Sequence, residues 1–251
     1  DSVNVVDSDV SIITNIAIDH TDYLGDTREA IGREKAGVMR GSRPCICGDQ
    51  DPPQSLLAYA KEIGTDITFV RKAYEDDIGL EGDHQRLNAA VAIQAVESLK
   101  EQHPISFSMI IEGVKSATIK ARFEKIEIGE KTIILDVAHN PAAVKTLVDT
   151  LSKSSMQTVA IFSALIDKDI IEMVDLASNA IKHWYLVPLT AERAIESDAL
   201  KNKFSNPDST TICKDMNSAI QESLAYKEAE RIVIFGSFYT IADASIIINE
   251  L

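Results

Sequence analysis

Two kinds of hydrophobic pattern alternate along the chain and predict an α/β protein. Short apolar runs are typical of buried strands, and longer amphipathic runs are typical of helices. In the first half, strands are predicted at 11–18, 43–47 and 67–70, and helices at 27–40, 51–63, 85–102 and 108–114. In the second half, strands are predicted at 132–137, 158–162, 184–187, 210–213 and 231–235, and helices at 141–151, 169–181, 194–204, 216–227 and 239–251.

The order of these elements also predicts how they are arranged. Strands that alternate regularly with helices form a mainly parallel sheet with helices on both faces, because parallel strands need long crossover connections. The segment 115–122 has no clear period, and we place a domain boundary in it. The expected domains are therefore residues 1–118 and 119–251.

Composition excludes several classes of function. The chain has 251 residues, of which 45% are hydrophobic and 25% charged, which is typical of a globular protein with a full core. Its net charge of −14 makes it a poor binder of nucleic acid or anionic membranes. The three cysteines lack zinc-site spacing, and an odd, small number of them suggests a reducing compartment. No run reaches membrane-spanning length and no signal-peptide pattern is present, so we expect a cytoplasmic protein.

Two predicted strands end in an acidic residue followed closely by a histidine. Asp19 and His20 follow the first strand, and Asp136 and His139 follow the strand at 132–137. Charged groups at the end of a buried strand are costly unless something binds there, and ligands bind outside the carboxyl ends of strands in open α/β sheets. The ordinary alternative for one such pair is a helix cap and a core histidine. Two pairs weaken that alternative, and His20 could contact a metal ion or a phosphate.

Several residues near helix starts allow both a structural and a functional interpretation. Asp26 could cap the helix at 27–40 with Glu29 in a capping box, and Asn140 is the expected cap of the helix at 141–151. The turn formed by Gly236 and Ser237 could hold an anion at a helix N-terminus, although capping alone would also account for it. Lys35 lies either on a solvated helix face or, given its apolar neighbours, on a partly buried functional one.

A phosphate-binding loop is absent from the sequence. The nearest match has Gly32 and Gly37 at the spacing of the two glycines of such a loop. Val38 and Met39 follow them, where Lys and Ser or Thr are required. The chain therefore contains no recognisable nucleotide cradle of that kind.

One long segment carries a specific family resemblance. The run I-T-N-I-A-I-D-H-T-D-Y-L-G-D-T-R-E-A-I-G-R-E-K-A-G-V-M-R at 13–40 resembles the signature of folylpolyglutamate synthase / dihydrofolate synthase, in the Mur ligase superfamily. Further matches are A-R-F-E at 121–124, I-L-D-V-A-H-N-P at 134–141, D-K-D at 167–169 and G-S-F-Y-T at 236–240. The resemblance implies the rest of a Mur-type central ATPase domain, followed by a Rossmann-like α/β domain.

The resemblance also implies roles for single residues, with ATP and Mg²⁺ as cofactors. His20 matches a magnesium ligand. Lys35 matches a lysine that is carbamylated in many members, and it is assigned a catalytic role together with His139. The residues that match nucleotide contacts are Asn88, Arg122 and Asp136. The residues assigned to substrate are Asp1, Ser2 and Ser237. Lys120 and Ala121 stand where the family often has Pro-Gly before the arginine.

The implied reaction is the ATP-dependent joining of a carboxylate to an amine. ATP phosphorylates the carboxylate to an acyl phosphate, and the amino group of L-glutamate then attacks it to form an amide. The expected substrates are dihydropteroate, reduced folate polyglutamates or both, and we expect a monomer. A Mur-type peptidoglycan ligase is the alternative enzyme. In the family the phosphate loop and a second magnesium ligand precede the residue that matches Asp1, so we expect an incomplete fragment that is nearly inactive alone and at best binds nucleotide.

Overall fold

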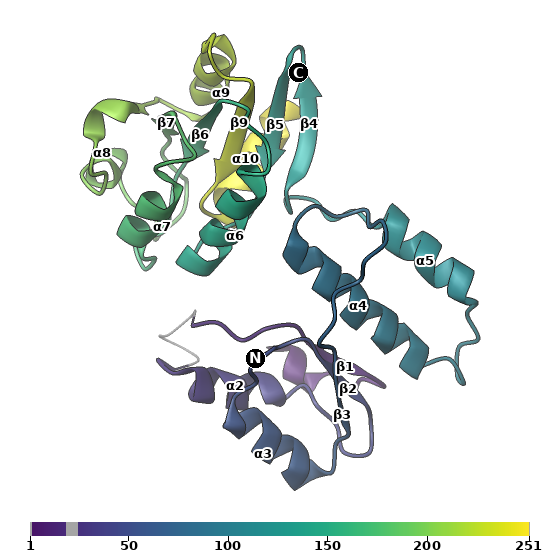
Figure 1. Cartoon of the computed structure of the whole chain (residues 1–251). Helices are drawn as coiled ribbons and strands as arrows, with labels where there is room; N and C mark the ends of the chain where they lie inside the picture. Colours follow the sequence, from purple (N-terminus) through teal and green to yellow (C-terminus); the bar gives the residue numbers. More distant parts are fainter. Residues whose placement is uncertain (1, 19–24, 251) are drawn as a thin grey trace. The chain divides into compact units, whose positions relative to one another are not determined.

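The chain divides into two compact units, Asp1–Thr118 and Ile119–Leu251 (Figure 1). The structure is a computed structural model, and it describes residues 2–18 and 25–250. Both units combine helices with sheets that are mainly parallel, which confirms the predicted fold class. Among the described residues, no helix is long and apolar enough to cross a membrane.

A parallel three-stranded sheet organises the first unit. Its strands are β1 (Ser11–Ile13), β2 (Cys45–Cys47) and β3 (Ile67–Phe69), in that order across the sheet. The core on one face joins the sheet to the helices α2 (Arg28–Ala36) and α3 (Gln54–Ile63). Val91, on the helix α4 (Asp83–Ser98), packs against Ile46 in a separate cluster. A short 3₁₀ helix, η1 (Ser2–Val5), precedes the sheet, and α5 (Phe107–Ser116) ends the unit.

The first strand is much shorter than its hydrophobic pattern predicts. The prediction of a strand over 11–18 is wrong beyond Ile13, where β1 ends. The backbone N–H of Ile16 donates instead to the carboxylate of Asp49, at 2.7 Å. Because β2 itself ends at Cys47, β1 has no further ladder to pair with, and a buried side chain replaces the missing backbone acceptor.

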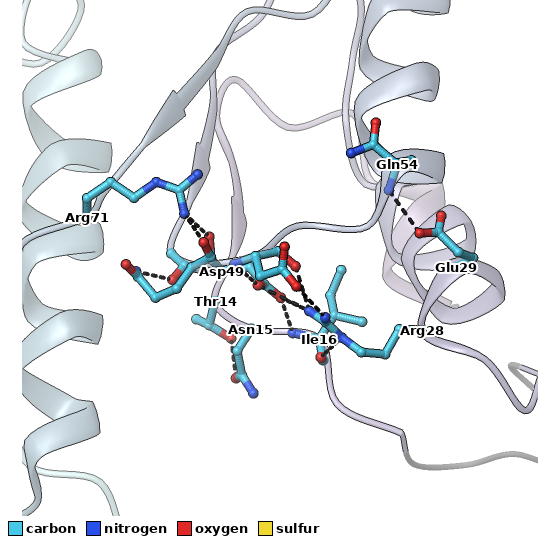
Figure 2. A network of polar contacts seen from close by, with 11 residues as sticks. Thr14, Asn15, Ile16, Arg28, Glu29, Asp49, Gln54 and Arg71 are labelled. Atoms are coloured by element: carbon cyan, nitrogen blue, oxygen red, sulfur yellow. Dashed lines mark hydrogen bonds and ion pairs between the residues drawn. The ribbon is translucent and has the colours of Figure 1, made fainter.

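The predicted capping box of Asp26 and Glu29 at the start of α2 is wrong. Thr27, not Asp26, precedes the helix, and its hydroxyl accepts from the N–H of Ala30. Glu29 does not close a capping box: its carboxylate accepts from the N–H of Gln54 at 3.1 Å (Figure 2) and from the N–H of Ser55 at 2.7 Å. Pro53 gives α3 no side-chain cap, so Glu29 satisfies the free donors at the start of the neighbouring helix. The helix also ends at Ala36, whereas its predicted end is Arg40.

A six-stranded sheet with the order β4-β5-β9-β6-β7-β8 forms the centre of the second unit. All its pairs are parallel except β4 with β5. The strands are β4 (Glu124–Ile128), β5 (Lys131–Leu135), β6 (Thr158–Phe162), β7 (His183–Leu186), β8 (Thr210–Ile212) and β9 (Arg231–Phe235). The helices are α6 (Pro141–Leu151), α7 (Ile170–Ala177), α8 (Ser197–Lys201), α9 (Met216–Ala225) and α10 (Phe238–Ile248), with a 3₁₀ turn η2 (Pro207–Ser209).

Helices cover both faces of this sheet, as the strand–helix alternation predicts. The core on one face joins the sheet to α6, α7 and α8, and the core on the other joins it to α9 and α10. Every residue of β6 and β9 is buried, which explains their continuous apolar runs. The alternating residues of each strand supply the two cores: Val233 and Phe235 face α6, while Ile232 and Ile234 face α10.

The hydrophobic pattern does not predict the antiparallel edge strand β4. Its sequence, E-K-I-E-I, contains only two apolar residues, and they alternate with charged ones that remain accessible. A tight turn with Gly129 at φ 60° joins it to β5. A short, charged edge strand gives little hydrophobic signal because only one of its faces is covered.

Candidate active site

The carboxyl ends of β5 and β9 meet at one edge of the six-stranded sheet. Their last paired residues are Leu135 and Ile234, and the chain beyond both strands stays joined, since the N–H of Gly236 donates to the carbonyl of Ala138 at 2.9 Å. This contact brings together two motifs that lie about a hundred residues apart in sequence. The structure therefore places Asp136 and His139 beside the turn at Gly236 and Ser237.

Asp136 fixes the backbone at this edge. Its two carboxylate oxygens accept from the N–H groups of Phe123 and Ala138, at 2.9 and 2.8 Å. Burial raises the pKa of Asp136, and these two hydrogen bonds and the charges of Arg122 and His139 oppose that rise. The carboxylate thus holds the segment that precedes β4 against the loop that follows β5.

That segment has an unusual backbone on both sides of Arg122. Ala121 and Phe123 have φ of 59° and 52°, in the left-handed region that side chains disfavour, and both are buried. Three contacts hold this geometry: Glu124 accepts from the N–H of Ala121, Val137 donates to the carbonyl of Ala121, and Asp136 accepts from Phe123. Arg122 itself is exposed. Strained backbone that a surrounding network holds is frequent at functional sites.

His139 has a fixed orientation on the loop after β5. Its Nδ1 lies 2.8 Å from the carbonyl of Val137, and because a carbonyl only accepts, Nδ1 must be the donor. In the neutral ring Nε2 is then the basic nitrogen. The imidazole also lies against the ring of Phe238, the first residue of α10, at 5.7 Å between centroids. Both strand-end loops therefore position this histidine.

Three helices begin at this edge, each after one of three neighbouring strands. Asn140, Asp169 and Ser237 cap α6, α7 and α10, respectively, by accepting from the backbone N–H three residues on. The prediction that Asn140 caps its helix is confirmed. The positive ends of the three helix dipoles favour negative charge nearby. This edge can therefore attract phosphate and carboxylate groups although the chain is strongly acidic overall.

The hydroxyl of Ser237 already has a structural use. It accepts from the N–H of Thr240 at 3.0 Å and forms a second hydrogen bond with the hydroxyl of Thr240 at 2.8 Å. The residue is only 3% exposed. These observations support the capping interpretation of Gly236 and Ser237, and they leave substrate contact by Ser237 a prediction.

The D-K-D motif supplied family resemblance but no site residues in the sequence analysis. The structure shows that Asp167 pairs with Arg193 at 3.3 Å and with Lys168 at 3.7 Å, on the loop after β6. Leu165 and Ala194 form an isolated bridge in the same place, which joins the loop after β7 to the loop after β6. No periodic signal in the sequence marks Arg193, because its partner lies on another loop.

In the first unit, a buried carboxylate joins two parts of the signature segment at 13–40. Asp49 accepts from the N–H of Ile16, and it pairs with Arg28 at 3.2 Å (Figure 2). Arg28 also donates through Nε to the carbonyl of Ile16 at 3.0 Å. Arg71 donates to the carbonyl of Asp49. These contacts hold residue 16 beside the first turn of α2, and the sequence analysis did not identify them.

The other predicted residues of the first unit are placed as follows. Lys35 lies half-buried in the last turn of α2. Asn88 lies on α4, where its side chain donates to that of Gln85 at 3.0 Å. Ser2 begins η1. Asp1 and His20 lie outside the described residues, so their predicted roles are not tested by the structure. Within residues 2–18 and 25–250, no group of three or more His, Cys, Asp or Glu side chains could hold a metal ion.

The network around Arg28 predicts unequal effects for its two acidic partners. Asp49→Asn is expected to lower the free energy of unfolding by about 1–2 kcal/mol, because an amide N–H₂ would face N–H donors. Asp51→Asn is the control, since that carboxylate pairs with the same arginine but is 94% exposed, and we expect a loss within about 0.5 kcal/mol. Urea unfolding of the first unit measures both. Equal losses would show that Asp49 does not organise the network.

Comparison with known proteins first identifies the class. Residues 121–238 match the family described as "Mur ligase, glutamate ligase domain". The chain is also 33% identical to a dihydrofolate synthase/folylpolyglutamate synthase of Buchnera aphidicola subsp. Acyrthosiphon pisum, over 97% of this chain and 63% of that protein. The resemblance of this chain to folylpolyglutamate synthase / dihydrofolate synthase, in the Mur ligase superfamily, is therefore confirmed.

Solved structures extend the similarity to the fold. The chain matches Escherichia coli FolC in complex with DHPP and ADP with a TM-score of 0.86 and 28% identity, over 98% of this chain and 63% of that one. It matches a bifunctional folylpolyglutamate synthase/dihydrofolate synthase with Mn, AMPPNP and L-glutamate bound with a TM-score of 0.85 and 32% identity, over 99% of this chain and 64% of that one. The chain thus spans a little under two thirds of the length of these relatives.

Proposed function

We propose that this chain is part of an ATP-dependent ligase that adds L-glutamate to dihydropteroate, to reduced folate polyglutamates or to both, in the cytoplasm. The observation that carries the proposal is the convergence of Asp136, His139 and three helix N-termini at one edge of the second unit, in a domain of the glutamate ligase family. The relatives that share this domain have been solved with ADP, AMPPNP and L-glutamate. The named folate enzymes among the relatives favour this branch over a peptidoglycan ligase.

The residues of the second unit have distinct proposed tasks. Arg122, exposed between two strained residues, binds the nucleotide, and Asp136 both holds that segment and contacts the nucleotide. The helix N-termini at Asn140 and Ser237 stabilise the negative charge of phosphate and carboxylate groups. ATP supplies the phosphoryl group that converts the substrate carboxylate into an acyl phosphate. The amine then attacks, phosphate leaves, and an amide bond forms, and we assign to His139 the acceptance of the proton that the amine loses.

Residues of the first unit complete the proposal. Asn88 contacts the adenine, and Lys35, carbamylated or not, adds to the charge arrangement near the phosphates. Asp1, Ser2 and, from the second unit, Ser237 bind the acceptor substrate or glutamate. The described residues contain no group of three or more His, Cys, Asp or Glu side chains that could hold a metal ion, and Mg²⁺ commonly binds to one or two side chains together with substrate phosphates and water. His20 is the ligand that this chain would contribute, and Mg²⁺ would neutralise phosphate charge when bound.

Nucleotide binding by the second unit tests the central assignment. We expect AMPPNP to shift the backbone amide resonances of Arg122, Phe123 and Ala138 in the 251-residue chain, and Arg122→Ala to weaken binding about tenfold. Lys203→Ala is the control, because this exposed lysine lies after α8, away from the carboxyl edge. If AMPPNP leaves these three amides unshifted, or if both variants bind equally, Arg122 is not a nucleotide contact.

A turnover assay tests the expectation that the chain is nearly inactive alone. The chain is mixed with ATP, Mg²⁺, L-glutamate and either dihydropteroate or a reduced folate, and ADP is measured. The full-length Escherichia coli relative serves as the positive control. We expect at most about one per cent of the control rate, because losing part of a catalytic arrangement costs on the order of a hundredfold. A rate close to that of the control would contradict this expectation while supporting the ligase activity.

A further inference from the structure

Arg231 is a buried cation at the amino edge of the second sheet, opposite the candidate active site. It is the first residue of β9 and is 5% exposed. Its Nε donates to the hydroxyl of Thr158 at 2.8 Å, and its Nη2 donates to the carbonyl of Leu151 at 3.0 Å. Both acceptors are neutral. The adjacent carboxylate, Glu230, accepts instead from the N–H of Gln157 at 3.0 Å.

The guanidinium therefore keeps unused hydrogen-bonding capacity. It has five N–H donors, and the two bonds above use one at Nε and one at Nη2. Within the described part of the chain, no acceptor serves Nη1 and no carboxylate forms an ion pair with Arg231. Burial lowers the pKa of Arg231, and the nearby charge of Glu230 opposes that change. The unused donors of Nη1 can therefore serve an anion from outside the chain.

A cavity of about 840 Å³ opens beside this arginine, within the second unit. It lies among the C-terminal ends of α6 and α7, the start of β6 and the segment 204–209. Trp184 and Phe204 contribute an apolar wall, and Ser152, Ser178 and Ser205 contribute hydroxyl groups. The volume falls within the range of small-molecule sites, which combine apolar walls with a few polar groups.

The remaining charges around the cavity limit what it can hold. Lys182 is an exposed cation at the rim. Negative charge is contributed by Asp175, whose carboxylate accepts from Ser205 at 3.3 Å, and by the negative dipole ends of α6 and α7. Arg231 itself donates a hydrogen bond to the last carbonyl of α6, at Leu151. The cavity therefore suits one anionic group beside Arg231, carried on an otherwise uncharged body.

We propose that this cavity binds a small molecule that carries one oxyanion group, a carboxylate or a phosphate, which accepts hydrogen bonds from Nη1 of Arg231. The site does not depend on the proposed ligase function, because it lies at the opposite edge of the sheet from Asp136 and His139. The ligand accepts hydrogen bonds from the planar guanidinium group of Arg231. A lysine ammonium group does not offer its donors in this planar arrangement.

Two anions test the proposal on the unmodified 251-residue chain. Inorganic phosphate and benzoate are titrated separately in chloride buffer, and NMR follows the side-chain Nε–H of Arg231 and the amides of Thr158 and Ser205. We expect saturable shifts with at least one anion, and the anion that binds more tightly identifies the oxyanion class. Shifts that stay linear at tens of millimolar with both anions would mean an adventitious ion only and would overturn the proposal.

Variants separate anion binding from a purely structural role of Arg231. Arg231→Lys is expected to weaken binding about tenfold by removing the second donor of the fork. Asp175→Asn, which removes the opposing charge, is expected to strengthen binding about twofold to fivefold, an effect that a structural arginine would not produce.

Ser205→Trp blocks the cavity while keeping Arg231, and it should abolish binding without preventing folding, since Ser205 is exposed. Lys227→Ala, an exposed lysine beyond α9, should bind like the unmodified chain. Unchanged affinity in both Ser205→Trp and Asp175→Asn would overturn the site.

Discussion

Gly236→Ala is expected to lower the free energy of unfolding of the second unit by about 3–5 kcal/mol. Gly236 has a φ of 115°, which lies in the region that favours glycine, and a Cβ there would stand 1.9 Å from the carbonyl oxygen of Ser163. Because that oxygen belongs to the backbone after β6, it cannot turn aside as a side chain could. The ends of β6 and β9 would have to separate. Chemical denaturation followed by Trp184 fluorescence measures the loss.

A second glycine in the same unit provides the matched control. Gly129 has a φ of 60° in the turn between β4 and β5, and a Cβ there would meet nothing within 4 Å. Gly129→Ala therefore tests positive φ without a steric clash, and we expect a loss of about 1 kcal/mol. If the two variants unfold at the same denaturant concentration, close approach at Gly236 does not constrain the carboxyl edge.

Asp136→Ala is expected to cost about 2–4 kcal/mol. The substitution removes the acceptor of two N–H groups, which belong to the buried residues Phe123 and Ala138. Phe123 also loses one of the contacts that hold its positive φ, so the segment around Arg122 should loosen. Hydrogen exchange at the Phe123 and Ala138 amides should accelerate more than exchange at the centre of β9. Unchanged protection of these two amides would contradict the proposed anchoring role.

An exposed aspartate on α6 serves as the control for Asp136. Asp149 pairs with Lys145 one turn away, at 3.3 Å, and its side chain is 64% exposed. Asp149→Ala should change the free energy of unfolding by at most about 0.5 kcal/mol, because solvent screens such pairs.

The stability difference between the native chain and Asp136→Ala should also depend on pH. Burial raises the pKa of Asp136 in the folded state above its ordinary value of 3.8, so the folded state holds this proton more tightly than the unfolded state. Stability from this group therefore rises as the pH falls through the folded-state pKa, and it is fully present below 3.8. We expect the native chain to gain stability relative to the variant over that interval. A relative loss there would show that the hydrogen bonds outweigh burial.

Local sequence patterns were sufficient for most of the second unit. The predicted helix at 141–151 and the predicted strands at 158–162 and 231–235 match α6, β6 and β9, because each lies in a fully covered layer with a strong apolar signal. The pattern failed at edges. β4 was missed because only one face of it is covered, and β1 was predicted too long because apolar residues continue after its pairing ends.

The candidate site shows the same division between local and distant information. Strand ends followed by polar residues indicated Asp136 and His139, and capping chemistry indicated Asn140. Nothing local indicated that Asp136 accepts from Phe123, that Phe238 packs on His139, or that Asp49 accepts from Ile16. The roles of Lys35, Asn88, Arg122 and the other assigned residues remain predictions that rest on the family resemblance.

The sequence by itself determined the alternation of strands and helices, the family resemblance, and the loops that carry polar residues after the strands. These properties depend on hydrophobic period and short motifs, which are local. Only the tertiary structure decided that β9 lies between β5 and β6, which places Gly236 against Ser163, and that Arg231 is buried at the opposite edge without a carboxylate partner among the described residues. Such contacts depend on the register between strands far apart in the chain, so a sequence pattern within any one of them does not specify the partner.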